Sequence, residues 1–167
     1  MANADKPFGF RFAYTLHGGP PAIHTYLNTA AIIYPGDPVY LDGAGRVAFC
    51  THDLAPMGVA MNYVSATADQ TVYVYDDLVN TIFTVQTDNA EPSANTKIGL
   101  FYDVTATTGD TVTLQSKHEM DGDATDTDTL ELIGLVDRPD NAWGLYGDVY
   151  VRFHVNSQIQ IITVTLT

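Results

Sequence analysis

The sequence predicts an all-β protein: a single antiparallel β-sandwich or barrel, jelly-roll-like, with an extended N-terminal arm. Short segments in which apolar and polar residues alternate recur along the chain, separated by turn residues at a spacing of roughly 8 to 15 residues. No long stretch has the apolar spacing of an amphipathic helix. Only 16% of the residues are charged, so Thr, Asn, Gln, Ser and Tyr must supply most of the polar surface, which suits strands.

The first alternation lies near the N-terminus. Aromatic residues at positions 8, 10, 12 and 14 alternate with small or polar ones, which predicts a strand with an almost wholly aromatic face. This segment is either the first core strand or an arm that buries its aromatic face on a neighbouring subunit. We assign residues 1–34 to an arm or extension and residues 35–167 to the β domain. Within the arm, residues 22–33 have either partly helical spacing or no regular structure.

Turn residues divide the next part of the chain into hairpins. Turns at Asp42-Gly43, at Asp76-Asp77 and at residues 107–110 are expected to join neighbouring strands into three hairpins, with Leu78 and Val79 closing over the core. The expected strands of this part are residues 39–41, 46–49, 59–64, 71–75, 81–86, 98–104 and 111–115.

The clearest alternation lies in residues 148–155, where Val149, Val151 and Phe153 share one face and polar residues share the other. A loop rich in turn residues, which contains Trp143, joins this strand to another at residues 130–136. The polar residues 116–129 are expected to form an exposed loop. A last alternating strand at residues 158–167 either completes a barrel or pairs with another chain.

A set of motifs in this part resembles the capsid decoration, or cement, proteins of tailed bacteriophages. The motifs cover roughly the last 95 residues, and residues 1–34 match nothing in that family. They are Val72-Tyr-Val-Tyr-Asp-Asp, Phe83-Thr-Val-Gln-Thr-Asp, Ile98-Gly, Asp103-Val, Leu132-Ile-Gly-Leu, Arg138-Pro-Asp-Asn-Ala-Trp-Gly and Val149-Tyr-Val-Arg-Phe, in that order.

The resemblance implies a virion protein, assembled in the host cytoplasm, on the outer surface of the expanded phage head. There a homotrimer would tie neighbouring major capsid proteins together and stabilise the head against the pressure of packaged DNA. The alternative from another class is a carbohydrate- or receptor-binding β-module, of the head-fibre or adhesin type, in which Trp143 and nearby tyrosines stack on sugar.

Composition excludes several other partners. The net charge of −13 argues against nucleic acid and against an anionic membrane surface, although an acidic surface also serves solubility alone. The sequence shows no secretory signal and no run of apolar residues long enough to span a membrane.

Cys50 has no second cysteine to pair with, and its neighbours predict a buried small hydrophobic side chain.

The sequence predicts no enzyme and no cofactor. The five histidines, at positions 17, 24, 52, 118 and 154, lack the spacing of a zinc site. No nucleophile elbow and no phosphate-binding loop occurs. The acidic residues 119–131 fail the spacing of an EF-hand, because Asp126 and Leu132 stand where that loop needs glycine and a carboxylate. Whether these carboxylates bind Ca²⁺ in another way is left open.

The candidate contact residues are therefore aromatic or apolar. Those expected to contact the capsid or a neighbouring subunit are Phe8, Phe10, Arg11, Phe12 and Tyr14. Those expected at the interface between sister copies are Trp143, Tyr146, Ile162 and Val164. For Trp143 the other interpretation is a plug on the end of its own barrel.

Overall fold

The computed structural model describes residues 3–51, 55–90, 95–123 and 129–154. In these ranges the chain is all-β, as predicted, and contains twelve strands with antiparallel pairing. Sheet 1 contains, in order across the sheet, β1 (Arg11–Thr15), β7 (Thr81–Gln86), β12 (Asp148–Phe153), β11 (Leu130–Leu135) and β8 (Phe101–Tyr102). Sheet 2 contains β2 (Ile23–Leu27), β6 (Thr71–Tyr75), β5 (Gly58–Ala60), β3 (Pro38–Leu41) and β4 (Val47–Phe49).

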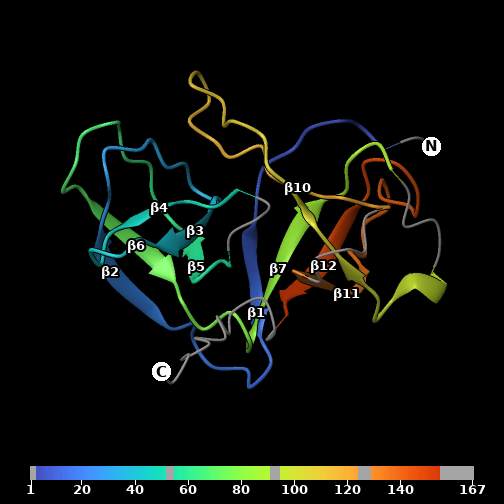
Figure 1. Ribbon diagram of the computed structural model, residues 1–167. Coiled ribbons are helices and arrows are strands. Elements are labelled where there is room, and N and C mark those ends of the chain that lie inside the picture. The colour runs from blue at the N-terminus through green and yellow to red at the C-terminus, as the bar shows by residue number, and fades with distance from the viewer. Residues whose placement is uncertain (1–2, 52–54, 91–94, 124–128, 155–167) are drawn as a thin grey trace, which may run out of the picture.

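The two sheets occupy the two halves of the molecule, and β1 is the strand of sheet 1 that lies nearest sheet 2 (Figure 1). A small third sheet joins β9 (Val104–Thr105) to β10 (Glu119–Met120), and a short 3-10 helix, η1, spans Asn95–Lys97. Neither large sheet closes into a barrel within the described ranges. No helix in this part of the chain is long and apolar enough to cross a membrane.

The core of sheet 1 follows the alternation expected for β11 and β12. Val149, Val151 and Phe153 are fully buried on one face, as predicted. The Phe153 ring lies 5.7 Å from the Phe83 ring on β7, so the strands of sheet 1 share one aromatic core. Asp148, predicted on the polar face, is also buried, and it forms an ion pair with Arg138 at 2.7 Å.

Sheet 2 has its own core on the face turned away from sheet 1. The predicted hairpin at Asp42 is confirmed: β3 pairs with β4, and the Asp42 carboxylate accepts hydrogen bonds from the backbone N–H groups of Ala44 and Arg46. The buried residues of this core are Ile33, Val39, Val47, Ala60, Val64, Val72 and Val74. The partly helical spacing noted in residues 22–33 does not produce a helix. Instead β2 pairs along its whole length with β6, because tertiary pairing overrides weak helical spacing.

Two of the three expected hairpins are wrong. β6 and β7 are strands, but they belong to different sheets, and residues 76–80 carry the chain from one sheet to the other. Leu78 in this crossing is buried, as expected. Residues 111–115 are not a strand, and β9 pairs instead with β10 across the longer connection 106–118. Turn residues show where a chain leaves a sheet, but not which strand it meets next.

The N-terminal segment is part of sheet 1. β1 pairs with β7, and a bulge between Phe12 and Tyr14 shifts the register. The extra residue reverses the alternation, so the Phe10 side chain is 2% exposed while the Tyr14 side chain is 42% exposed. The prediction of a continuous aromatic face is therefore wrong. Of the two interpretations, pairing within the chain fits a first core strand. The division of the chain at residue 34 stays a prediction.

Hydrogen bonds also hold the residues before β1. The Asn3 side-chain amide donates to the carbonyl groups of Ala142 and Leu145 in the Trp143 loop. The buried Gln86 side chain accepts from the Lys6 N–H and donates to the Ala4 carbonyl. The start of the described chain is thereby fixed to the β11–β12 loop.

Part of the expected polar loop 116–129 is buried. Ser116, His118 and Met120 alternate inward and are at most 2% exposed, because β10 pairs with β9 and Ser116 and His118 find partners inside. The prediction that residues 116–120 form an exposed loop is therefore wrong. Residues 124–128, and the expected terminal strand with Ile162 and Val164, lie outside the described residues.

Candidate functional site

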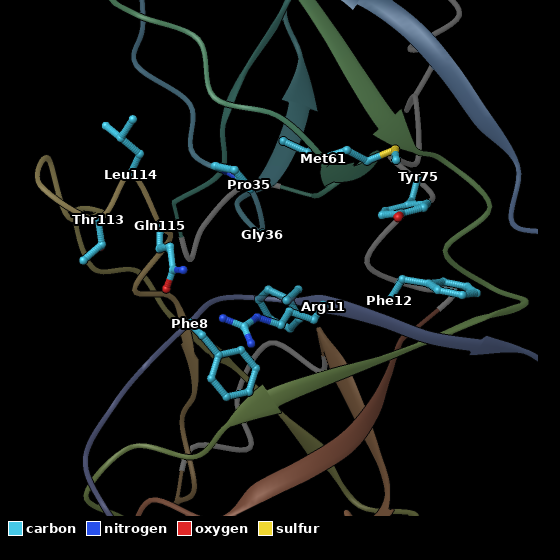
Figure 2. A pocket seen from close by; sticks show the side chains of 12 residues that line it. Phe8, Arg11, Phe12, Pro35, Gly36, Met61, Tyr75, Thr113, Leu114 and Gln115 are labelled. Atoms are coloured by element: carbon cyan, nitrogen blue, oxygen red, sulfur yellow. The ribbon is translucent and has the colours of Figure 1, made fainter.

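A groove runs between sheet 1 and sheet 2 beside β1. Its cavity measures about 500 Å³. Figure 2 shows its walls: the start of β1 lies on one side, Met61 and Pro35 lie opposite, and residues 113–115 close one end. The lining residues are Phe8, Phe10, Arg11, Phe12, Pro35, Gly36, Ala60, Met61, Tyr75, Thr113, Leu114 and Gln115.

An aromatic pair joins the two sheets across the groove. Phe12 of β1 and Tyr75 of β6 are stacked, with ring centroids 5.5 Å apart and an interplanar angle of 22°. The Tyr75 ring also meets the edge of Phe83, which anchors the pair on the core of sheet 1. Burial raises the pKa of Tyr75, so its hydroxyl stays protonated at neutral pH and remains a hydrogen-bond donor.

One cation faces the groove. The Arg11 guanidinium carbon lies 4.4 Å from the centre of the Phe8 ring, a cation–π contact that fixes the side chain along the wall. Among the described residues that line this cavity, none carries a carboxylate. The groove is thus locally positive in a chain whose net charge is −13.

A second cavity of about 420 Å³ lies next to the groove and shares with it the lining residues Phe8, Arg11 and Gln115. It adds Lys6 and Arg138, so three of the chain's seven basic residues line it. Arg138 forms ion pairs with Asp140 and Asp148 of the same cavity. For Lys6 and Arg11 the structure records no carboxylate partner within the described ranges.

On the opposite side of Tyr75 the groove opens onto an exposed apolar face of sheet 2. Ile23 and Tyr75 are cross-strand partners, so Ile23, Leu27, Tyr73 and Met61 share the face of Tyr75. They are 42%, 45%, 48% and 36% exposed, respectively. We call these four residues the apolar face. It is contiguous with the groove through Met61 and Tyr75.

A serine, a histidine and an aspartate meet inside the protein, and their geometry argues against a catalytic triad. Ser116 Oγ and Asp37 Oδ1 both lie 3.1 Å from the same His118 nitrogen, Nδ1, while Nε2 lies 3.3 Å from the Cys50 carbonyl oxygen. A triad needs the hydroxyl and the carboxylate on opposite nitrogens and a hydroxyl open to substrate. Here Ser116 is fully buried, so the group holds the 116–120 segment against Asp37.

The remaining reactive candidates are also accounted for by packing. Cys50 is buried, as predicted, and burial raises the pKa of its thiol to about 12, so the nucleophilic thiolate is not populated at neutral pH. Within the described ranges, no three His, Cys, Asp or Glu side chains are placed to hold a metal ion. Glu119, near Asp5 and Asp88, has its pKa raised to about 7, chiefly by burial and then by the two carboxylates.

The structure brings four of the predicted contact residues together at the groove: Phe8, Phe10, Arg11 and Phe12. The Phe10 side chain itself belongs to the core, with its ring 5.0 Å from that of Phe153. Tyr14 lies outside the groove, on the outer surface of sheet 1, with its ring 5.8 Å from that of Tyr150.

The predicted interface residues are not brought together: none lines the first cavity, Tyr146 lines the second, and two lie outside the described chain. Trp143 is partly buried against the core of sheet 1, so its ring packs within its own chain, and its role at an interface stays a prediction. Tyr146, in the same loop, has a φ of 57° and lines the second cavity. Ile162 and Val164 lie outside the described residues.

The sequence did not point to several groove residues. Met61, Leu114 and Gln115 come from segments far apart in the chain, and no local pattern marks them. Tyr73 and Tyr75 did carry a signal, because in Thr71-Val-Tyr-Val-Tyr two tyrosines must share one face of the strand. No family model, no curated protein and no solved structure matches the chain.

Proposed function

We propose that the chain is a decoration, or cement, protein of a tailed-phage head, which binds the outer surface of the expanded head between major capsid proteins. Two things support the proposal. Four of the seven motifs that resemble this family begin in β6, β7, β11 and β12, and the apolar face offers a contact surface. The apolar face is the observation that carries it, because clustered exposed apolar side chains mark protein–protein contact sites.

The energy available at this face is modest. Fully burying one large apolar side chain contributes about 1.5–3 kcal/mol, and each of the four residues has somewhat less than half of its surface left to bury. Together they would contribute on the order of 3–5 kcal/mol, which is comparable to the lower estimates of the cost of association. A single copy would therefore bind weakly, and stable attachment requires several linked contacts.

A homotrimer would supply those linked contacts. Three copies that touch adjacent capsid subunits bind together far more tightly than any one of them, because the second and third contacts form intramolecularly. The trimer would then stabilise the expanded lattice, which presents the sites at the correct spacing, over lattices that do not. The partners in this proposal are the major capsid protein and sister copies of the chain.

Co-sedimentation with phage heads tests the proposal. Purified protein is mixed with expanded heads that lack this component and with unexpanded proheads, and its mass is measured by light scattering. A trimer that pellets with expanded heads and raises their rupture temperature is the expected result. The double variant Leu27→Ser, Tyr73→Ser should bind at least tenfold more weakly, while Val112→Ser, at an 89% exposed position away from this face, should bind normally. A monomer that ignores heads would refute the proposal.

The alternative, a carbohydrate-binding module, rests on a different observation. The stacked Phe12–Tyr75 pair lines the same open groove as the Gln115 amide and the Arg11 guanidinium. Aromatic rings next to hydrogen-bonding side chains are typical of sugar-binding sites. Binding to a glycan array that is lost in Phe12→Ala would favour this alternative over the cement protein.

A further inference from the structure

We infer that the groove beside β1 binds an extended peptide segment in which an acidic side chain stands next to an aromatic or branched aliphatic one. The inference rests on the proposed function for the source of that peptide, a segment of the capsid partner. It adds which chemistry of the partner is recognised and which residues of this chain recognise it.

The shape of the site favours a peptide. The two cavities, of about 500 and 420 Å³, share Phe8, Arg11 and Gln115 in their walls, so an extended chain that passes these three residues would occupy both. One end of the site is apolar, with the Phe12–Tyr75 pair and Met61, and the other end, beyond Phe8, Arg11 and Gln115, is polar and basic. A chain laid along it would place a hydrophobic side chain at the first end and a charged one at the second.

Charge complementarity selects an acidic segment. Arg138 is already neutralised by Asp140 and Asp148, but the Arg11 guanidinium meets only the Phe8 ring among the contacts that the described residues make. Its five N–H donors are suited to holding a carboxylate in a bidentate pair. Lys6 adds a second cation to the same end. A basic segment would meet no carboxylate in the first cavity and would lose the attraction.

The backbone of β1 offers the peptide a place to pair. Among the described strands β1 lies at the edge of sheet 1, and Phe10, directly before it, donates its N–H to the Gly36 carbonyl oxygen at 2.9 Å, on the side away from β7. Strand geometry turns the backbone groups of Phe12, two residues later, to that same side, where the groove lies. The bulge after Phe12 ends this edge. An added strand could therefore pair at one position of β1, while side chains supply the remaining contacts.

The far wall is held in a strained conformation. Leu114 has a φ of 54°, which non-glycine residues rarely adopt, and it lines the first cavity with its side chain 41% exposed. The Asp110 carboxylate maintains this turn by accepting hydrogen bonds from the N–H groups of Val112 and Thr113 and by pairing with Lys117. Strain of this kind persists at ligand-binding walls because the surrounding contacts fix it.

A displayed library of random linear peptides tests the inference without any phage component. The library is selected on the immobilised full chain, and enriched peptides are synthesised with a fluorescent label and titrated by anisotropy. We expect enriched sequences to carry Asp or Glu beside an aromatic or branched aliphatic residue. Affinity should fall about tenfold or more in Arg11→Gln and in Phe12→Ala, and raising the salt concentration should weaken binding.

Arg46→Gln is the matched control. Arg46 lies between β3 and β4, its side chain is 42% exposed, and it forms an ion pair with Asp69. Its loss should leave peptide affinity unchanged. Circular dichroism checks that each variant is folded. The inference is overturned by a library without enrichment, by enriched peptides without an acidic residue, or by equal affinity in Arg11→Gln. Competition by an acidic oligosaccharide would also overturn it, because the groove would then be a sugar site. A changed oligomer mass in Phe12→Ala would overturn it too, because the groove would then bind a second copy of the chain.

The two proposals fail separately. If peptides bind as expected but the chain ignores expanded heads, the cement function is refuted and the peptide site stands. If the chain binds heads and both Arg11→Gln and Phe12→Ala bind them as well as wild type, the cement function stands and the peptide site is refuted.

Discussion

The sharpest stability prediction concerns Glu119 on β10. Its Oε1 atom is buried and has no hydrogen-bond partner among the described residues, and Asp5 and Asp88 lie nearby. Burial, followed by these two carboxylates, raises the pKa of Glu119 from 4.5 to about 7. Because the folded chain holds this proton more tightly than the unfolded chain, the free energy of unfolding falls as pH rises from about 4.5 to about 7 and is constant above that.

The size of the effect follows from the shift. A change of roughly 2.5 pH units at about 1.4 kcal/mol each gives about 3.5 kcal/mol as an upper bound. Glu119 is only half-buried, so solvent screening reduces this to about 1–2 kcal/mol. In Glu119→Gln the loss disappears. The variant should match wild type at about pH 5 and be more stable by about 1–2 kcal/mol at about pH 8.

Urea unfolding followed by circular dichroism at several pH values measures this. The control is Glu131→Gln on β11, which removes a carboxylate that pairs with Arg152. It should lower stability by up to about 1 kcal/mol and leave the downward trend between about pH 5 and about pH 8 intact. If Glu119→Gln keeps the wild-type pH dependence, the argument from burial and like charges is refuted.

Three further predictions follow from packing and can be measured by the same unfolding experiment. Phe153→Ala should destabilise the chain by about 3–5 kcal/mol, because it empties the aromatic core of sheet 1, and an effect under about 1 kcal/mol would show that the core can collapse. Gly58→Ala should lower the free energy of unfolding by more than about 2 kcal/mol, because the new Cβ would lie 2.2 Å from Val74 Cγ1 and 2.7 Å from the Tyr75 carbonyl oxygen. The control is Gly43→Ala, because nothing lies within 4 Å of a Cβ at that position. Asn141→Ala should cost about 1–3 kcal/mol because its side chain makes three hydrogen bonds, one to Val136 directly after β11 and two to Asp148 at the start of β12, and an unchanged midpoint would contradict that role.

Local patterns predicted the parts of the fold that depend on local physics. The alternation in residues 148–153 identified β12 and its buried face, because a two-residue period is a property of the strand itself. Asp42 and Gly43 identified the β3–β4 hairpin, because the turn sets that pairing. The bulge at Phe12 escaped prediction, since an inserted residue leaves the same aromatic spacing in the sequence.

Non-local pairing is what the sequence could not supply. Asp76 and Asp77 mark a turn, but whether the chain turns back or crosses to another sheet depends on partners many residues away. The groove has the same origin. Arg11 and Phe12 were candidates because exposed-looking aromatics and cations suggest contacts. Tyr75 and Leu114 lie beside them only because sheet 2 and the 106–118 connection between β9 and β10 pack there.

The order of sheet 1 has a consequence for how the chain folds. β12, the last strand to be synthesised among those described, lies between β7 and β11 rather than at an edge. Until residues 148–153 leave the ribosome, β7 has one unpaired edge and Phe83 lacks the cover of Phe153. Sheets built from such distant pairings close slowly, and open apolar edges bind one another meanwhile. A chain interrupted before β12 should therefore leave sheet 1 open and prone to aggregate, even if the separate core of sheet 2 has formed, so sheet 1 is completed late.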